Sequence, residues 1–245
     1  MCTVSFIPNS RGFSLAMNRD ELLTRPTALP PQVFASNGCC SVFPREPTGG
    51  TWIVLNDAGV WLTLINWHRV DRLPVGEIVS RGEVPKALAE SDSIREITIK
   101  LNRLSLTRIR PFRLIACEPG EKQLVEYGWD LEQVKVQKHD WKPNHWFSSG
   151  HDEKQAEYQR AQICQAAWHQ PSAGTLEWLR DLHRSHLPER GPFSICMHQP
   201  VAQTVSYTEV SVSDRVAVMR YQPGSPCAGG KIYEATLALN RYEAG

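Results

Sequence analysis

Short apolar segments separated by polar turns dominate the first part of the chain. They predict two pairs of strands, at 2–7 with 12–17 and at 52–55 with 60–65. The first pair is joined by a polar turn of hairpin length at 8–11, and Asn56, Asp57 and Gly59 supply turn chemistry for the second. Residues 24–50 carry five prolines and few periodic apolar positions, so we expect a long irregular loop there.

Helical patterns occur twice in the rest of the chain, each time as a pair. The first pair is predicted within 82–104, where Ser93 and Glu96 have the spacing of a capping box. The second pair follows Asp152, with helical spacing of Tyr158, Ala161, Cys164, Ala167 and Trp168 and then of Leu176, Leu179 and Leu182. Further strands are expected at 112–117, 123–129, 132–137, 193–198, 204–212, 215–221 and 231–239.

This order of elements predicts an α+β protein in which sheets pack against each other and helices cover them outside. With 245 residues, 41% of them hydrophobic, the chain can close one sizeable core. We therefore expect a single domain over residues 1–245.

Charge and hydropathy narrow the function classes. The formal net charge is +1, which gives no field that would attract nucleic acid. The longest apolar runs, such as 60–65 and 112–117, are strand-length, so no membrane span is expected. No secretory signal is visible, and the seven cysteines lack disulfide-framework spacing, so we expect a cytoplasmic protein with free thiols.

Cys2 has an unusual position for a cysteine. Its side chain is small enough for an aminopeptidase to remove Met1, which would leave a free α-amino group on the residue that carries the thiol. The amine has an ordinary pKa of about 7.7 to 8.0 and the thiol one of about 8.5, so the amine can accept the thiol proton. The alternative is that Cys2 is a small buried hydrophobic residue at the start of a strand.

Several short blocks give the chain a family resemblance. Met1-Cys2-Thr3 followed by Met17-Asn18-Arg19-Asp20-Glu21 resembles the signature of the NRDE family, also called the transport-and-Golgi-organisation family. Later blocks resemble that family in the same order, at 48–52, 64–67, 80–83 and 112–116. The resemblance covers nearly the whole chain and is strongest over residues 1–116.

The resemblance implies a fold and a set of site residues. The family is similar to N-terminal-nucleophile (Ntn) hydrolases, and more remotely to bile salt hydrolases and penicillin V acylases, which have a four-layer αββα fold. By that similarity Cys2 is the nucleophile, Arg19 and Asp20 orient the amine and the thiol, and Asn66 stabilises the oxyanion. The candidate substrate-binding residues are Asn18, Trp52, Arg81 and Ser149.

The sequence also departs from the acylases. Arg19 and Asp20 are adjacent, whereas the acylases space the pair as Arg-x-x-Asp. Ser149 stands where a second oxyanion asparagine is expected, and the late arginine of the acylases has no clear counterpart in 202–209. Without the family context, an adjacent Arg-Asp pair would more often be a surface ion pair, and a lone Asn a turn or strand cap.

Other histidine and cysteine groupings do not favour a metal or a cofactor. His139, His145 and His151 recur at intervals of six and Cys39 is followed by Cys40, but neither grouping has zinc-site spacing. His183 and His186 lie three apart on a predicted helix, where solvated histidines are common. Gly49-Gly50 lacks the Lys-Ser or Lys-Thr of a phosphate loop. We expect no resident metal and no cofactor.

Three functions remain open at this point. The first is a thiol amidohydrolase acting on a non-peptide C–N bond of a small molecule. The second, implied by the resemblance, is a carrier of haem or an acyl lipid on the same fold. The third is an interaction protein in which the motif only stabilises structure. The oligomeric state is left open.

Overall fold

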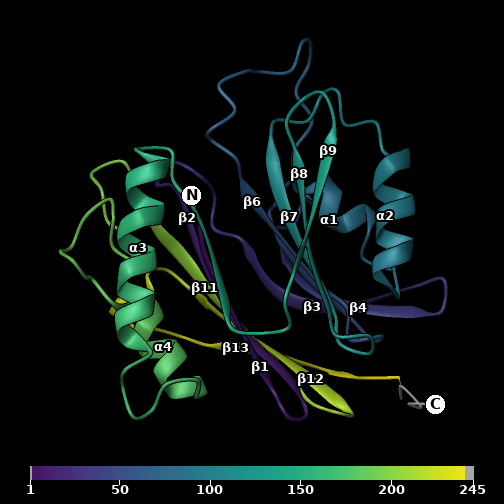
Figure 1. Cartoon of the computed structure of the whole chain (residues 1–245). Helices are drawn as coiled ribbons and strands as arrows, with labels where there is room; N and C mark the ends of the chain where they lie inside the picture. The colour runs from purple at the N-terminus through teal and green to yellow at the C-terminus, as the bar shows by residue number, and fades with distance from the viewer. Residues whose placement is uncertain (1, 241–245) are drawn as a thin grey trace.

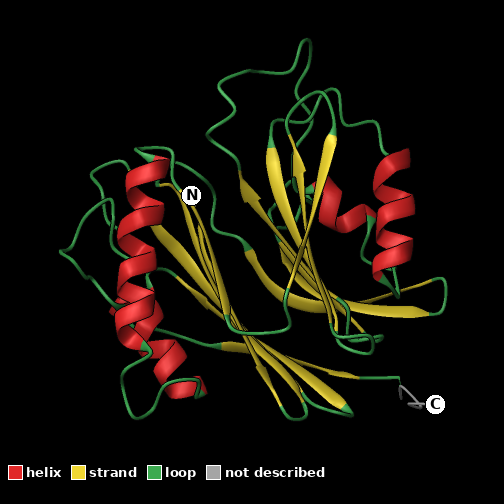
Figure 2. Ribbon diagram, viewed as in Figure 1, coloured by secondary structure: helices red, strands yellow, loops and turns green. Residues whose placement is uncertain are grey.

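Two antiparallel sheets lie face to face, and a pair of helices covers the outer face of each (Figure 1; Figure 2). The computed structural model describes residues 2–240. One sheet has the strand order β10 (Asn144–Ser148), β1 (Cys2–Asn9), β2 (Gly12–Leu22), β11 (Ala202–Val212), β12 (Val216–Pro223) and β13 (Tyr233–Ala238). The other has the order β3 (Leu29–Ser36), β4 (Cys39–Arg45), β5 (Ile53–Asn56), β6 (Trp61–Asn66), β7 (Phe112–Glu118), β8 (Gln123–Trp129) and β9 (Val134–His139).

The helices complete a four-layer αββα arrangement. The pair α3 (Glu153–Ala167) and α4 (Leu176–Arg184) covers the sheet that contains β1. The pair α1 (Glu83–Ala87) and α2 (Ile94–Arg103) covers the sheet that contains β6. A short 3-10 helix, η1 (Pro226–Ala228), lies between β12 and β13. The fold class expected from the order of elements is confirmed.

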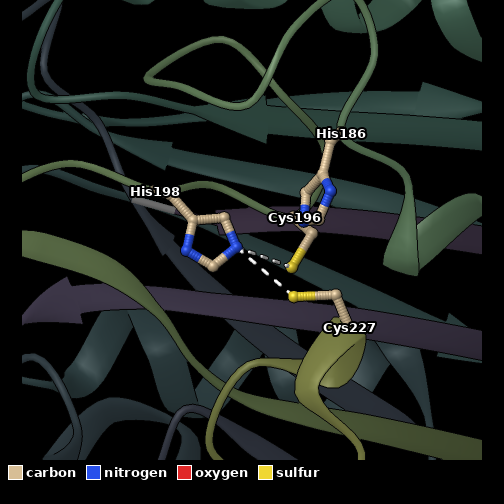
Figure 3. A group of neighbouring side chains, drawn as sticks. All are labelled: His186, Cys196, His198 and Cys227. Atoms are coloured by element: carbon tan, nitrogen blue, oxygen red, sulfur yellow. Dashed lines mark hydrogen bonds between the residues drawn. The ribbon is translucent and has the colours of Figure 1, made fainter.

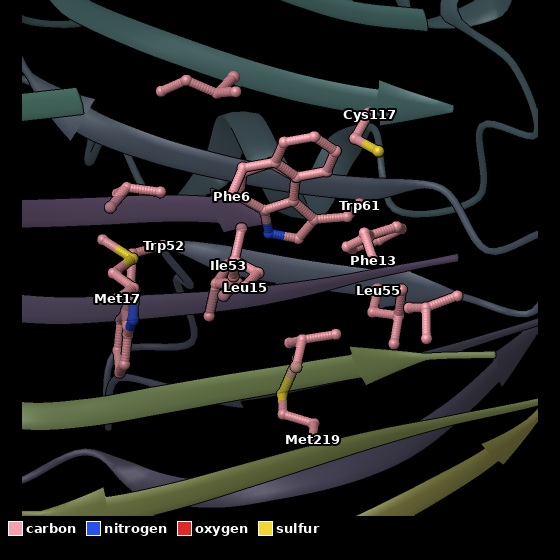
Figure 4. Close-up of a cluster of buried hydrophobic side chains, with 14 of the residues drawn as sticks. Phe6, Phe13, Leu15, Met17, Trp52, Ile53, Leu55, Trp61, Cys117 and Met219 are labelled. Carbon is pink, nitrogen blue, oxygen red and sulfur yellow. The ribbon is translucent and has the colours of Figure 1, made fainter. Parts of the chain in front are cut away.

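Strand alternation decides which side chains enter the space between the sheets. On β1, Cys2, Val4 and Phe6 belong to the core between the sheets, whereas Ser5 bonds to a histidine of α4 on the other face. Figure 4 shows part of this core, including Phe6, Phe13 and Trp61. The Phe6 and Phe13 ring centroids are 5.4 Å apart. At this distance the two rings attract each other, which stabilises the fold beyond the burial of their apolar surface.

Each helix pair closes a further apolar core against its own sheet. On α2, Ile97 and Leu101 are buried, and the Ser93 side chain caps the helix by accepting from the Glu96 amide. On α4, Trp178 and Leu179 are buried in the same way. Three cores between four layers account for the sandwich. None of the helices described is long and apolar enough to cross a membrane.

The expected face of α3 is partly wrong. Tyr158 is 64% exposed, whereas Cys164 is buried as expected, together with Glu153 and with Ala156 and Arg160, which precede Cys164 at intervals of four. The sequence pattern missed this face because its central position is a charged residue. Asp152 caps the helix as expected, since its side chain accepts from the Gln155 amide at 2.9 Å.

The expectation of an irregular loop over 24–50 is wrong. This region contains the hairpin of β3 and β4, which turns at Asn37 and Gly38 with φ angles of 49° and 78°. An Asn-Gly pair tolerates these left-handed angles and is a strong hairpin signal. Pro30 and Pro31 are accommodated because β3 is at the sheet edge, where the pairing register shifts between Leu29 and Gln32.

Two other strand expectations need correction. Residues 193–198 form no regular strand, and within them only His198 makes an isolated bridge, to Gln203. The strand β10 was not expected, because its central apolar pair Trp146-Phe147 is flanked by polar residues. It pairs with β1 and brings Ser148 opposite Cys2.

Candidate active site

The start of β1 opens into a cavity of about 400 Å³, a size in the range of small-molecule sites. Cys2 lies at this point, buried to 6% exposure, and its register partner on β2 is Arg19. Met1, whose removal is expected, lies outside the described residues. The cavity is lined by Cys2, Arg19, Asp20, Glu21, Arg25, Glu46, Thr48, Thr51, Trp52, Leu64, Asn66, Ile78, Val79, Ser80, Arg81, Gly82 and Arg110.

Arg19 is part of a compensated charge group on one wall of the cavity. Its guanidinium ion-pairs with Glu46 and lies 3.6 Å from Glu21. Arg25 contacts both of these carboxylates, at 3.2 Å from Glu46 and 3.4 Å from Glu21. The Arg19 guanidinium also stacks over Trp52, with its carbon 4.3 Å from the ring centroid. Two arginines and two glutamates therefore neutralise one another and hold Trp52 in place.

Asp20 follows Arg19 but makes separate contacts. Its Oδ1 accepts a hydrogen bond of 2.6 Å from the Thr204 hydroxyl on β11. Its Oδ2 accepts from Arg160 of α3 at 3.4 Å. Adjacent residues on a strand point to opposite faces, so Arg19 and Asp20 belong to different networks that meet near Cys2.

Arg160 is the residue that sequence reasoning missed. Its side chain is fully buried, and its Nη1 donates to the Cys2 carbonyl at 3.4 Å and to the Thr3 hydroxyl at 3.1 Å. Its other nitrogens reach the carbonyls of Pro192 and Phe193. Arg160 thus holds the backbone of the candidate nucleophile. The available signal was its place between Ala156 and Cys164 on one helix face.

The thiol and the carboxyl near it are both affected by burial. Burial raises the pKa of the Cys2 thiol, the Asp20 carboxylate adds to the increase, and Arg19 opposes it. Burial also raises the pKa of Asp20, although the charge of Arg160 and the hydrogen bond from Thr204 favour its ionised form. Cys2 therefore needs a base close by before it can attack a carbonyl.

Asn66 and Arg81 face the same cavity from two other segments. Asn66 ends β6, and its side-chain amide makes no hydrogen bond with any described residue. Arg81 precedes Gly82, whose carbonyl accepts from the Thr51 amide at 3.1 Å. A Cβ at Gly82 would come within 2.9 Å of the Thr51 nitrogen, so glycine permits this close approach. The contact brings the segment of Arg81 against the segment of Trp52 at the cavity.

Two arginines of the cavity have no carboxylate partner in the part of the chain that the structure describes. Neither Arg81 nor Arg110 forms an ion pair with a described residue, and the Arg81 Nη1 donates only to the Pro111 carbonyl, at 3.2 Å. Burial, with Arg110 nearby, lowers the pKa of Arg81 to about 10. Arg81 therefore remains cationic near neutral pH, and with the Arg110 guanidinium close by, this side of the cavity attracts an anionic group.

Two of the expected substrate-binding residues do not line this cavity among the residues described. The Asn18 amide donates to the carbonyls of His183 and Ile195, each at 2.9 Å, and so ties β2 to the helix layer. Ser149 is buried after β10, where its hydroxyl accepts from the His151 amide at 3.2 Å. Cys2, Arg19, Asp20, Asn66, Trp52 and Arg81 are the expected residues that the fold brings together.

Solved structures of two hydrolases share this architecture. Penicillin V acylase from Agrobacterium tumefaciens is 10% identical, with a TM-score of 0.57 over 96% of this chain and 85% of that one. A variant of conjugated bile acid hydrolase from Clostridium perfringens is 9% identical, with a TM-score of 0.53 over 100% of this chain and 98% of that one. At such identities the likeness shows the fold alone, which is that of the Ntn hydrolases.

Sequence comparison identifies the family. No curated protein sequence gives a match. The family model described as Transport and Golgi organisation 2 matches residues 1–205, which is most of the chain and includes every lining residue of the cavity. The chain therefore belongs to the Transport and Golgi organisation 2 family and has the Ntn hydrolase fold.

Proposed function

We propose that this protein is a thiol amidohydrolase that cleaves a non-peptide C–N bond in a small anionic molecule. The observation that carries the proposal is the cavity. There Cys2, at a strand start, meets the Asn66 amide, which has no hydrogen-bond partner among the described residues, and Arg81 and Arg110, which have no described ion-pair partner. The first two supply a nucleophile and an oxyanion donor, and the arginines supply a binding site for a negative group.

The proposed reaction begins once Cys2 is the N-terminal residue. The thiol proton passes to the α-amino group, and the sulfur forms a bond to the amide carbon. Asn66 donates a hydrogen bond to the resulting oxyanion. The ammonium then protonates the leaving nitrogen as the C–N bond breaks, which leaves a thioester. Water cleaves the thioester, releasing the carboxylic acid and restoring the thiol.

The surrounding residues have supporting roles in this scheme. Because burial raises the pKa of the Cys2 thiol, the amine is the group that makes attack feasible near neutral pH. Arg160 fixes the Cys2 carbonyl, and Asp20 lies beside the same backbone. These two are positioning residues, since neither needs to contact the substrate.

The second candidate function is carriage of haem or an acyl lipid without turnover. Ser149 in place of an oxyanion asparagine favours it, since a full acylase donor set is missing. The cavity lining opposes it. Seven lining residues are charged and four are large and apolar, and no histidine is among them. Haem and acyl-chain sites are mostly apolar, so we favour a polar, anionic amide as the ligand.

The experiment compares wild type, Cys2→Ala and Asn66→Ala, after intact mass has confirmed that each begins at residue 2. Each is incubated with N-acyl amino acids, with a β-lactam and with an acyl thioester, and is titrated separately with haem and acyl-CoA. We expect an acyl adduct on the N-terminal peptide of wild type and none on Cys2→Ala. Asn66→Ala should acylate about 10²- to 10³-fold more slowly with little change in binding.

A thiol outside the cavity supplies the control. Cys39→Ala should acylate like wild type, because the Cys39 thiol bonds to Asp57 and does not line the cavity. Haem or acyl-CoA binding by all variants, with no adduct or turnover by wild type, would refute the hydrolase and favour the carrier.

A further inference from the structure

Four side chains of the types that can bind a metal ion converge near the start of β11. His186 lies two residues beyond α4, Cys196 and His198 lie in the segment before β11, and Cys227 lies in η1. Figure 3 shows the four side chains turned toward one another. None of them lines the cavity at Cys2, so this group is separate from the candidate active site.

The distances suit a single tetrahedral ion. The four ligand atoms all lie within 4.8 Å of one another. The His198 Nε2 is 3.6 Å from the Cys196 sulfur and 3.4 Å from the Cys227 sulfur. Zinc bonds of about 2.3 Å to sulfur and about 2.0 Å to nitrogen, at tetrahedral angles, place the two ligands about 3.5 Å apart. Two edges of the ligand tetrahedron are therefore already in place.

Hydrogen bonding leaves the group incompletely satisfied. One imidazole nitrogen has either one hydrogen or one lone pair, so His198 Nε2 cannot make two full hydrogen bonds to two sulfurs. The Nε2 of His186 is buried and has no hydrogen-bond partner among the described residues. Both sulfurs belong to free cysteines. Buried polar atoms without partners are uncommon in folded proteins. A bound metal ion would give each of the four ligand atoms a partner.

The backbone around the group is fixed by hydrogen bonds. The Cys196 amide donates to the Ser185 carbonyl at 2.9 Å, which joins its segment to the end of α4. The His198 amide donates to the Gly191 carbonyl at 3.1 Å. Next to η1, the Ser225 hydroxyl donates to the Thr204 carbonyl at 2.7 Å. The three segments are thus held in position by contacts that do not depend on the ligand side chains.

Charge and ligand type select the ion. Two thiolates and two neutral imidazoles balance the charge of a divalent cation, which suits a partly buried site. A set of two cysteines and two histidines is typical of structural zinc, and soft sulfur ligands disfavour magnesium and calcium. Arg190 contacts the His198 Nδ1 at 3.4 Å, which favours the tautomer with hydrogen on Nε2. Metal binding would displace that hydrogen and release Arg190.

We propose that His186, Cys196, His198 and Cys227 form a four-coordinate zinc site. With all four positions filled by the protein, the ion is structural rather than catalytic. It ties α4, the segment before β11 and η1 together. The site also borders the contacts of Asp20, since the Met197 amide between two ligands donates to the Thr204 hydroxyl, which in turn bonds to Asp20. Zinc therefore stabilises the segment before β11, which contacts Asp20 through Thr204 and accepts hydrogen bonds from Arg160.

The test begins with the full-length wild type, stripped by a chelator under reducing conditions and titrated with zinc against a chromophoric competitor. We expect one zinc ion per chain, and a tetrahedral thiolate spectrum when cobalt(II) replaces zinc. Cys196→Ser and Cys227→Ser should each lose stoichiometric uptake. Cys39→Ser is the matched control and should bind one equivalent, because Cys39 lies in β4 and contacts Asp57 instead.

A second measurement does not depend on a variant that can fail to fold. Wild type is alkylated with and without zinc, and the peptides are quantified by mass spectrometry. Zinc should slow labelling of Cys196 and Cys227 and leave Cys39 and Cys40 unchanged. Three results would overturn the proposal: less than one equivalent bound with no cobalt spectrum, uptake unchanged by both ligand variants, or a Cys196–Cys227 disulfide in protein purified without oxidant. None of these bears on the Cys2 reaction.

Discussion

Arg160 and Asp20 are an ion pair in which both side chains are fully buried, with 3.4 Å between Nη2 and Oδ2. The pair joins α3 to β2 behind the candidate nucleophile. Its remaining polar atoms are used as well, because Thr204 donates to Asp20 and Arg160 donates to backbone carbonyls that include that of Cys2. A buried pair of this kind is costly to break from one side, since it leaves the other charge without a partner.

Arg160→Met should therefore destabilise the protein by about 3 to 5 kcal/mol, measured by urea unfolding. Arg160→Met combined with Asp20→Asn should be less destabilised than the single variant, because no buried charge is left alone. Gln162→Met, on the exposed side of α3, is the control and should change stability little. A loss of less than 1 kcal/mol on Arg160→Met would contradict the structural role given to this pair.

Acid should destabilise the fold through His183. Burial lowers the pKa of His183 to about 3, from 6.5 in the unfolded chain, and its Nδ1 has no described hydrogen-bond partner. The native state keeps this imidazole neutral, so below pH 6.5 only the unfolded state gains a proton. Stability is therefore lost as pH falls, by about 2 kcal/mol between about pH 7.5 and pH 5 from this residue.

Urea unfolding at the two pH values isolates this contribution. His183→Gln should be less stable than wild type near pH 7.5, because it loses the bond to Ser5, but its further loss at pH 5 should be about 2 kcal/mol smaller. His169→Gln changes an exposed histidine and should keep the wild-type pH dependence. An equal pH dependence in all three proteins would show that His183 is not the titrating group.

The sequence alone predicts the parts of the site that depend on neighbouring strands and the turns between them. A hairpin around residues 8–11 sets the register that places Cys2 opposite Arg19. Asn66 could be placed because it ends a short apolar strand after a clear turn. These relationships need only strand periodicity and turn chemistry, together with the family resemblance that gives the residues their roles.

The contacts that could not be predicted join segments far apart in the chain. Arg160 is 140 residues from Asp20, and although its place between Ala156 and Cys164 indicates a shared helix face, that spacing does not identify Asp20 as its partner. The cluster of His186, Cys196, His198 and Cys227 has no zinc-motif spacing, because three separate segments supply it. Which long-range partners meet depends on how four layers pack, and periodicity carries no information about that.

Gly82→Ala tests the close approach that positions Arg81. The added methyl group would meet the Thr51 nitrogen at 2.9 Å and the Gly50 Cα at 3.0 Å, both of them backbone atoms. Inserting a methyl group into a packed site lowers the free energy of unfolding by about 1 to 3 kcal/mol, so Gly82→Ala should have a lower thermal unfolding midpoint than wild type. Gly191→Ala is the control, because its methyl group would meet nothing within 4 Å. Equal midpoints for both variants would mean that the two segments separate easily.

Removal of Met1 should change the reactivity of one thiol only. In processed protein, Cys2 should react with iodoacetamide near pH 7 faster than Cys39, Cys117, Cys164, Cys196 and Cys227, because the adjacent amine can accept its proton. Protein expressed with an aminopeptidase inhibitor retains Met1, and there burial should keep the Cys2 thiol protonated and slow. Peptide mass spectrometry gives both rates. Identical Cys2 rates in the two forms would remove the amine from the mechanism.

The unpaired arginines should determine which amides the cavity accepts. Arg81→Ala and Arg110→Ala each remove a cationic group that has no described carboxylate partner, so they should raise the KM for an N-acyl amino acid. The KM for the matched neutral amide, in which the carboxylate is replaced by a carboxamide, should change little. Arg72→Ala is the control, because Arg72 is paired with Glu132 at the surface and does not line the cavity.

An exposed or partly buried charge contact is worth about 1 kcal/mol or somewhat more, which corresponds to a KM increase of roughly 5- to 10-fold for the anion. The effect should weaken at high salt, as expected for a partly solvated charge. Equal changes for the charged and neutral substrates would show that these arginines shape the cavity without recognising a negative group.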